Sequence, residues 1–342
     1  MGIERIEDWT RDADSSVSGD VVHLRAHTPR RLEPLRPGQR VGRYVVLERL
    51  GAGGMGVVYA AHDPVLDRTV AVKLLPPQRP TPGASTEDVL REGRVMAQLS
   101  HPGVVAVHDA GVLADGVVYL VLDHIDGRSA RQWLREERPD WRRALEVLTG
   151  AGRGLAAAHA AGIVHRDVKP ANVLVGRNGR ASLADFGLAL AARVDDTDTC
   201  ASAGTPSYMA PEQHDGRTPD ARADQFSFCV LLYEAVYGER PFEPENLPDV
   251  PPAIAMAVAV TVGEVRPAPK GSSVPASLRR ILLRGLAVDP EDRWPSMEAL
   301  LEALDGVEAP RPPIGGLAVT AAEVLVGAAA ALVGVAAIVA LV

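Results

Sequence analysis

The chain has 342 residues, a hydrophobic fraction of 46% and a formal net charge of -8. This length exceeds one average domain and suits a two-lobed enzyme core with appended segments, and the apolar fraction is sufficient for a sizeable core. The acidic balance and the lack of a long basic run exclude a dedicated nucleic-acid binder. The two cysteines, Cys200 and Cys229, are too few for a zinc or disulfide framework, and they indicate a reducing compartment.

Residues 1–40 are predicted to form a disordered N-terminal arm. They mix both charges with a Pro- and Arg-rich run and show no sustained hydrophobic period. The arm lacks the apolar run of a secretory signal, so the folded part is expected in the cytoplasm.

A glycine-rich turn joins two apolar strands after Tyr44. Its glycines are Gly51, Gly53 and Gly56. Dinucleotide-binding folds use similar spacings, but there the glycines open a helix, whereas Val57 begins a β-branched, strand-like run. The pattern predicts a flexible hairpin over phosphates, in which backbone N–H groups approach the ligand because side chains are absent.

Lys73 lies within an apolar strand over 69–75, and it is one of only three lysines in the chain. A buried lysine is costly unless it is paired, so a carboxylate partner is expected. Glu92, on a helix predicted over 85–99, is the best-placed candidate, and the alternative is a solvated Glu92. Strands at 104–107 and 117–122 complete a predicted five-stranded antiparallel sheet with one helix.

The region after a connector at 122–127 is predicted to be mainly helical, and it contains a dense polar loop from His165 to Asn172. In this loop Asp167 is placed to accept a proton from a hydroxyl, Lys169 to neutralise a transferring phosphoryl group, and Asn172 to ligate magnesium. The alternative is a polar turn around a satisfied histidine.

Two further motifs follow this loop. Asp185-Phe186-Gly187 combines an acid, an aromatic anchor and a glycine pivot, so Asp185 is expected to make a second magnesium contact on a movable hinge. The polar stretch 194–205 carries hydroxyls that are natural phosphate acceptors, with Arg166 as the nearest cation. The alternative for 194–205 is a solvated linker.

Three buried or semi-buried charges in the helical region are assigned structural roles. Asp224 lies in a strongly apolar helix predicted over 220–237, and capping of the catalytic-loop backbone would account for it. Arg293 is expected to pair with Glu212 and so to fasten the end of the polar stretch.

Residues 306–316 are predicted to be a Pro-rich linker and residues 317–342 a transmembrane helix. The stretch 324–342 has no polar side chain, and at ~1.5 Å per residue it matches the thickness of a bilayer core. A buried docking helix is the alternative, but such helices are usually amphipathic. Gly327, Ala331 and Gly334 would allow close helix pairing and hence a homodimer.

With these motifs in order, residues 44–304 resemble the protein kinase fold, specifically the bacterial eukaryotic-type (Hanks-type) Ser/Thr protein kinases. The resemblance implies an α+β fold with a small antiparallel β lobe containing one helix and a larger helical lobe, here assigned to residues 41–305. The motifs that carry it are Gly51-x-Gly53-x-x-Gly56-x-Val58, Val70-Ala-Val-Lys73, Glu92, His165-Arg-Asp167-x-Lys169-x-x-Asn172, Asp185-Phe-Gly187, Ala210-Pro-Glu212 and Arg293.

The resemblance also implies roles for these residues. Asp167 would be the catalytic base, Lys169 would steady the γ-phosphate, and Lys73, paired with Glu92, would contact the α- and β-phosphates. Asn172 and Asp185 would hold Mg²⁺. The residues expected to contact ATP are Gly51, Ala52, Gly53, Gly54, Met55, Gly56, Val58, Ala71, Lys73, Glu92, Leu122 as gatekeeper, Asp123, Ile125 and Leu174.

The implied function is transfer of the ATP γ-phosphoryl group to serine or threonine hydroxyls of proteins, in signalling at the cell membrane through a single span, with the kinase domain in the cytoplasm. Lys169 with Thr205 resembles the Ser/Thr branch, and Thr197 and Thr199 occupy the autophosphorylation positions. A nucleotide-binding pseudokinase is the rival, although pseudokinases typically lose one of the motif residues that are present here. A small-molecule phosphotransferase is disfavoured by the long 185–212 segment.

Two departures from the family pattern stand out. Asp123 occupies a position where glutamate is commoner, which affects only the connector. The region 248–262 is unusually rich in proline and alanine, which puts the mode of substrate docking in doubt.

Overall fold

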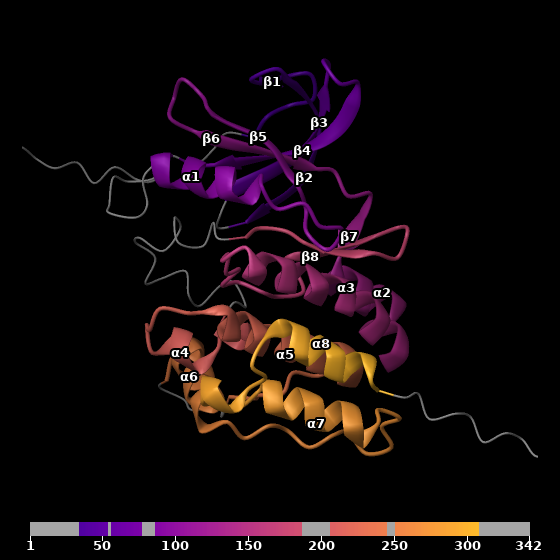
Figure 1. The fold of residues 1–342 in the computed structure, drawn as a ribbon. Helices are drawn as coiled ribbons and strands as arrows, with labels where there is room; N and C mark the ends of the chain where they lie inside the picture. Colours follow the sequence, from indigo (N-terminus) through magenta and orange to yellow (C-terminus); the bar gives the residue numbers. More distant parts are fainter. Residues whose placement is uncertain (1–33, 54–55, 77–85, 187–205, 245–249, 308–342) are drawn as a thin grey trace, which may run out of the picture. The chain divides into compact units, whose positions relative to one another are not determined.

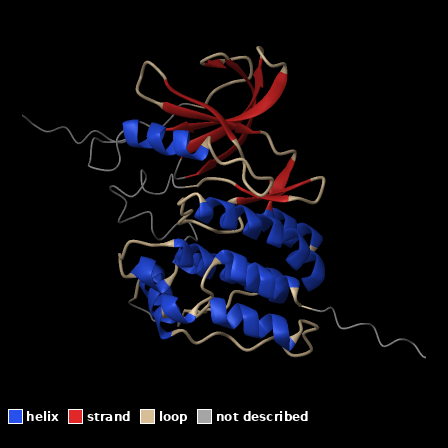
Figure 2. Cartoon of the chain, viewed as in Figure 1, coloured by secondary structure: helices blue, strands red, loops and turns tan. Residues whose placement is uncertain are grey.

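The structure is a computed structural model that describes residues 34–53, 56–76, 86–186, 206–244 and 250–307. Its strands are concentrated in the first half of the described chain and its helices in the second (Figures 1 and 2). The strand-rich lobe and the helical lobe each have their own buried apolar cluster.

The first sheet is antiparallel throughout and has the strand order β1-β2-β3-β4-β6-β5. It has six strands, one more than the sequence predicted, because a short strand pairs with the start of the glycine-rich hairpin. The strands are β1 Arg40–Val41, β2 Tyr44–Gly53, β3 Gly56–Asp63, β4 Arg68–Leu75, β5 Val107–Val112 and β6 Val118–Asp123.

The predicted strand at 104–107 is wrong in its bounds, since β5 begins only at Val107. Val104 instead forms a parallel bridge with Leu183, and the Val105 N–H donates to the Leu183 carbonyl oxygen at 2.8 Å. The apolar character of this stretch therefore reflects burial against the helical lobe, with Val104 and Val105 each 5% exposed.

One helix, α1 (Thr86–Met96), packs against β5 and β6 (Figure 1). Val89, Gly93 and Met96 form its buried face, at the spacing of successive turns. Gly93 matters here, because a Cβ at this position would lie 3.2 Å from Cδ2 of Leu120 on β6. The glycine thus allows close packing of helix and sheet beside the candidate site.

The helical lobe is organised around α5 (Ala221–Tyr237), which is buried on nearly all sides and contacts α3, α7 and α8. Because its apolar side chains are spread over all sides of the helix, most of its surface has to be enclosed. The remaining helices are α2 Ala130–Glu137, α3 Trp141–Ala160, α4 Pro211–His214, α6 Pro252–Val262, α7 Ala276–Gly285 and α8 Met297–Asp305, with 3-10 turns η1 Pro206–Tyr208 and η2 Pro290–Asp292.

A second sheet, ordered β7-β8-β9, lies beside α2 and α3. Its strands are β7 Gly127–Ser129, β8 Val173–Gly176 and β9 Ala181–Leu183. The polar loop 165–172 leads directly into β8, and Asp185 follows directly after β9. Since β8 and β9 are antiparallel neighbours, the sheet brings the two predicted magnesium-binding motifs to the same edge.

Within the described ranges, no helix combines the length and the apolar character needed to cross a membrane. The predicted span 317–342, most of the linker 306–316 and most of the arm 1–40 fall outside those ranges.

Candidate active site

The polar loop holds its acid in one orientation. Asp167 is buried, and its Oδ2 lies 2.8 Å from Nζ of Lys169 and accepts a hydrogen bond of 3.0 Å from Nδ2 of Asn172. The same amide nitrogen donates to the Asp167 carbonyl oxygen at 2.9 Å. Both partners therefore engage Oδ2, and no donor to Oδ1 is found among the described residues.

Asp224 on α5 fixes the backbone of this loop, as the sequence predicted. Its two carboxylate oxygens accept the backbone N–H groups of His165 and Arg166, each at 2.6 Å, and Oδ2 also lies 2.8 Å from Nε2 of His159. Arg166 has a φ of 68°, in the left-handed region that non-glycine residues rarely adopt. Charge-assisted hydrogen bonds to a carboxylate that is 1% exposed offset the cost of this conformation.

The His165 ring links the loop to the second magnesium-binding motif. Its Nε2 lies 2.9 Å from the carbonyl oxygen of Ala184, and the ring packs on Phe186 with centroids 4.4 Å apart. Phe186 is thus the aromatic anchor that the sequence suggested, while Gly187 lies outside the described residues.

Lys73 pairs with Asp185 in this structure. Its Nζ lies 2.8 Å from Oδ1 of Asp185, although the two do not form a well-aligned hydrogen bond, and the lysine is 2% exposed. The expected Lys73–Glu92 ion pair is not found among the described residues, so that prediction is wrong for this conformation. The physical reason is that the backbone of Asp185, with a φ of 65°, directs its carboxylate to the ammonium and takes the position expected for Glu92.

Glu92 faces a small, mainly apolar cavity between α1, the first sheet and the residues after β9. Burial raises the pKa of Glu92 to about 6, and the charge of Arg166 opposes that rise. An ionised Glu92 is therefore costly here at neutral pH. The cavity is lined by Glu92, Gly93, Met96, Val105, Val107, Leu120, Leu122, Asp185 and Phe186.

The side chain of Arg166 is partly buried, and the stretch 194–205 that it was predicted to contact lies outside the described residues. Its Nε is buried without a hydrogen-bond partner in the described part of the chain, and its charge acts on Glu92. The carbonyl oxygen of Arg166 accepts a hydrogen bond of 2.9 Å from Nε2 of Gln213. The acceptors predicted for phosphorylation, Thr197 and Thr199, lie outside the described residues.

The residues predicted to contact the adenine ring lie on one face of the first sheet and on β8 of the second sheet. In the first sheet Val58 is directly opposite Lys73, and Ala71 is directly opposite Leu122, so cross-strand pairing places all four on one face. Leu174 is on β8, opposite Ser182. The strand pairing thus places Val58, Ala71 and Leu122 on one sheet face and Leu174 on the second sheet.

The backbone groups of the connector differ in their contacts. The N–H of Asp123 donates to the carbonyl oxygen of Ala106 at 3.0 Å, whereas no backbone hydrogen bond of Ile125 occurs among the described residues. The Asp123 carboxylate lies 2.5 Å from Nε2 of His108. The Asp123 side chain is therefore directed to β5, the edge strand of the first sheet.

In the glycine-rich hairpin, Gly51 pairs with Val58, Ala52 with Val57 and Gly53 with Gly56. A Cβ on Gly51 or Gly53 would meet nothing within 4 Å, so their small size keeps space open. Gly56 is different: it has a φ of 135°, and a Cβ would lie 2.0 Å from the Leu74 carbonyl oxygen. Gly54 and Met55 are outside the described residues.

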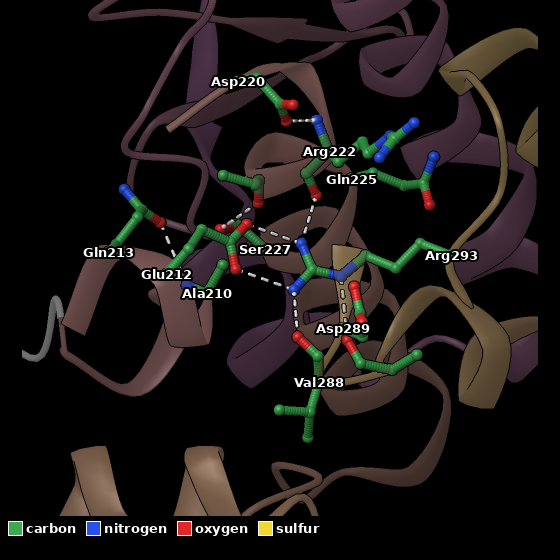
Figure 3. A network of polar contacts seen from close by, with 12 residues as sticks. Ala210, Glu212, Gln213, Asp220, Arg222, Gln225, Ser227, Val288, Asp289 and Arg293 are labelled. Carbon is green, nitrogen blue, oxygen red and sulfur yellow. Dashed lines mark hydrogen bonds and ion pairs between the residues drawn. The ribbon is translucent and has the colours of Figure 1, made fainter. Parts of the chain in front are cut away.

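The predicted Glu212–Arg293 pair is present and buried. The guanidinium binds both carboxylate oxygens, at 2.7 and 2.8 Å, with side-chain exposures of 0% for Arg293 and 7% for Glu212. It also donates to the carbonyl oxygens of Ala287, Arg222 and Val288 (Figure 3).

Three polar residues of this network were not singled out from the sequence. Gln213 accepts a hydrogen bond from the Ala210 N–H (Figure 3) and donates one to the Arg166 carbonyl oxygen. Gln225 donates to the carbonyl oxygen of Trp294 and accepts from its N–H, and Ser227 donates to the Tyr208 carbonyl oxygen. For Gln225 and Ser227 the available signal was a polar side chain in a largely apolar helix, which had drawn attention only to Asp224.

The described residues contain no group of three or more His, Cys, Asp or Glu side chains placed to bind a metal. Asn172 and Asp185 nevertheless fit magnesium, because each offers one oxygen that the contacts above leave over. Mg²⁺ is usually held by one or two protein oxygens together with substrate phosphates and water. The donor set therefore suits Mg²⁺ bound with a nucleotide.

Comparisons with known proteins agree with this geometry. A family model described as a protein kinase domain matches residues 44–303. A probable serine/threonine-protein kinase of Streptomyces coelicolor is 38% identical over 292 residues, which are 80% of this chain and 41% of the relative. Serine/threonine-protein kinase PknA of Mycobacterium tuberculosis is 36% identical over 278 residues, which are 80% of this chain and 63% of PknA.

The kinase domain of Mycobacterium tuberculosis PknI, a solved structure, is similar with a TM-score of 0.61 and 30% identity, covering 80% of this chain and 99% of that one. The chain spans about half the length of the curated relatives it matches. It belongs to the protein kinase family, and its curated relatives are bacterial Ser/Thr kinases, which confirms the resemblance. ATP with Mg²⁺ is the standard cofactor pair of this family.

Proposed function

We propose that this chain is an active Ser/Thr protein kinase that transfers the γ-phosphoryl group of ATP to protein hydroxyls. The observation that carries the proposal is the arrangement at Asp167, where Lys169 and Asn172 both engage Oδ2 and leave Oδ1 for the acceptor hydroxyl. An acid held in this way accepts a proton from a serine or threonine as the oxygen attacks phosphorus.

The other residues then have distinct tasks. Lys169 neutralises charge on the transferring group, and Lys73 binds phosphate oxygens from the sheet side. Asn172 and Asp185 supply oxygen ligands for Mg²⁺, which offsets phosphate charge when bound. In the productive state Lys73 exchanges Asp185 for Glu92, so that Asp185 is released to the metal.

A test on the 1–342 chain compares the wild type with Asp167→Asn, using labelled ATP, Mg²⁺ and a basic acceptor protein. The rate of transfer should fall by about 10²- to 10⁴-fold in Asp167→Asn, with nucleotide binding retained. Asp126→Asn is a matched control, because Asp126 is an exposed acid that pairs with Arg177. Nucleotide binding by the wild type without any transfer would favour the pseudokinase alternative.

Autophosphorylation at Thr197 and Thr199 is the second part of the proposal. Its support is sequence position alone, between Asp185 and Glu212. Mass spectrometry of wild-type chain incubated with Mg²⁺ and ATP should find phosphate on one or both threonines, and Asp167→Asn should carry none. Phosphate confined to other residues would contradict this part.

The membrane arrangement is the third part: arm 1–40, kinase domain 41–305, linker 306–316 and a single span 317–342 in the cell membrane, with the kinase domain in the cytoplasm. Its support is the run without polar side chains at 324–342. Cell fractionation should recover the 1–342 chain with membranes and a 1–310 chain in the soluble fraction. Cross-linking of the wild type but not of Gly327→Leu would support pairing of spans into a homodimer.

A further inference from the structure

One side of α6 presents aliphatic side chains to solvent. Ile254, Val258 and Val262 are 54%, 56% and 62% exposed, and their i, i+4 spacing places them along one side of the helix. The buried residues of α6 are Ala255, Met256 and Val260. Single exposed aliphatic residues are ordinary on a protein, but a continuous stripe of them marks a surface that another apolar surface covers.

The stripe itself carries no charge, because residues 252–262 contain neither an acid nor a base. The exposed charged residues that follow it in the chain, up to the end of α7, are Glu264, Lys270, Arg280 and Arg284. Arg266 is bound by Glu239 at 3.0 Å and by Glu243 at 2.8 Å. Both signs of charge therefore follow the stripe, so apolar contact rather than electrostatic attraction has to drive its binding.

A second exposed apolar site, Val65 with Leu66, differs from the stripe. These residues are 70% and 57% exposed in the turn between β3 and β4. Asp67 follows them directly, and its side chain is 97% exposed. Because a carboxylate is costly to remove from water, Asp67 keeps this turn in solvent, whereas α6 has no charged residue that would do so.

In the proposed membrane arrangement a bilayer lies within reach of α6. The described part of the chain ends at Val307, just after α8, and the proposed span begins at residue 317. Residues 308–316 reach at most ~30 Å when fully extended, which is about the diameter of a small domain. Figure 1 shows α6 and α7 at the end of the helical lobe away from the first sheet, and α8 contacts α7. A bilayer along this end can therefore contact α6 while the linker enters the membrane.

The composition of α6 favours lipid over a protein partner. Protein interfaces depend on a few Trp, Tyr and Arg anchors, and α6 has none of these residues. A lipid surface requires apolar area without a matching shape. Three side chains are too few to anchor a protein alone, since even a myristoyl chain binds a bilayer only marginally. A span in the same chain raises the effective concentration of the stripe at the bilayer, which makes the contact favourable.

We propose that the exposed side of α6 docks the kinase domain onto the lipid bilayer, with Ile254, Val258 and Val262 inserted at the boundary between head groups and acyl chains. This rests on the proposed membrane span and goes beyond it, because it defines which face of the domain lies on the membrane. The first sheet then lies on the side away from the bilayer.

The test uses the 1–342 chain in phosphatidylcholine vesicles, with a fluorescent probe on Thr261→Cys in a Cys200→Ala background. Thr261 is exposed and lies on the side of the stripe, and the buried Cys229 stays unlabelled. An interfacial helix lies ~5–10 Å into the boundary, so a nitroxide near the lipid head group should quench the probe about twofold more than one at the end of the acyl chain. Raising the salt concentration should leave this ratio unchanged.

Val258→Asp should abolish the quenching, because it places a carboxylate within the stripe. Val65→Asp is the matched control, since it makes the same change at another exposed valine, and it should keep the quenching of the wild type. Val258→Trp should increase the quenching, because tryptophan favours the membrane interface, and a loss of folding cannot produce this gain. A probe on Val65→Cys should be quenched by neither lipid.

The outcomes separate the docking from the span. If the chain floats with the vesicles but neither lipid quenches the probe on Thr261→Cys, the docking is overturned and the span stands. A probe that is shielded from a water-soluble quencher, but not quenched by the lipids, would show that a protein covers α6, and it would also overturn the docking. If the 1–342 chain does not float with the vesicles, both are overturned.

Discussion

The two sides of the candidate site differ in how fully their charges are satisfied. On the helical side, Arg293 uses its donors on Glu212 and three carbonyl oxygens, and Asp224 receives two backbone N–H groups and His159. On the sheet side, Lys73 has one charged partner among the described residues, the poorly aligned Asp185, and Glu92 faces an apolar cavity.

The difference suggests separate tasks for the two sides. A buried network with every group bonded has one favourable arrangement and so holds the catalytic loop in place. Among the described residues Lys73 pairs only with Asp185, and the pair is poorly aligned, so the sheet side is held by fewer contacts and can change partners when a ligand arrives. The following substitutions break or sharpen this contrast.

The largest effect is expected from Arg293→Ala. It leaves the Glu212 carboxylate buried without its cation, which costs about 3–5 kcal/mol, and it also strips three carbonyl oxygens of their donor. For a domain of this size the melting temperature should fall by about 10 °C. Thermal unfolding measures this shift. A change in melting temperature under 2 °C would contradict the idea that the Arg293 network makes the helical side rigid.

Asp224→Asn should have the next largest effect. The amide keeps the size of the side chain, but one of its two ends now carries N–H donors and faces a backbone N–H, so about 1–3 kcal/mol is expected. The rate of phosphoryl transfer should fall more than the stability alone explains, because the left-handed Arg166 loses its support. Asp220→Asn is the control, since this exposed residue caps the same helix.

Glu92→Gln should increase the stability of the nucleotide-free chain, whereas the two substitutions above lower it. The pKa of Glu92 is about 6 in the folded chain against an ordinary value of 4.5, so ionisation of Glu92 destabilises the fold increasingly from pH 4.5 to pH 6 and fully above pH 6. Removing the charge should stabilise the chain by about 1–2 kcal/mol at pH 7, and the gain should vanish as the pH falls below 4.5. Denaturant unfolding at pH 7 and pH 4.5 tests this. A loss of stability at pH 7 would show that Glu92 is already paired.

Gly93→Ala should have the smallest effect. Alanine is favoured over glycine within a helix by about 1 kcal/mol, and although its methyl group would lie 3.2 Å from Cδ2 of Leu120, that atom is the end of a flexible side chain and can shift. A gain of about 0.5–1 kcal/mol is expected in denaturant unfolding. Gly154→Ala on α3 is the matched control, because its Cβ would lie 2.1 Å from the Gly103 carbonyl oxygen, and it should destabilise.

The helical side could be predicted from the sequence in some detail. An acid or arginine within an apolar helix or turn has few partners that satisfy it, so Asp224 and the Glu212–Arg293 pair followed from burial and charge alone. The bounds of α5, Ala221–Tyr237, agree with the strongly apolar helix predicted over 220–237. Gln213 and Gln225 escaped notice because a neutral amide on a helix is usually exposed, and nothing in the sequence marks it as buried.

The sheet side could be predicted only in part. The sequence placed Lys73 in a buried strand and identified two acids, Glu92 and Asp185, but it cannot rank two carboxylates that compete for one ammonium group. That ranking depends on the position of α1 and on the φ of Asp185, which are set by packing over long sequence distances. The start of β5 was misplaced for a related reason, since apolar Val104 is buried by the helical lobe rather than by the sheet.

The Lys73–Asp185 pair has a thermodynamic consequence for ligand binding. In the proposed function the ammonium and Mg²⁺ would require the same carboxylate, so each would oppose the other until phosphate oxygens drew the lysine away. A nucleotide that did so would raise the affinity of the site for the ion, and by linkage the ion would raise the affinity for the nucleotide by the same factor. The internal ion pair would then make nucleotide and metal bind cooperatively, beyond any attraction between the two ligands themselves.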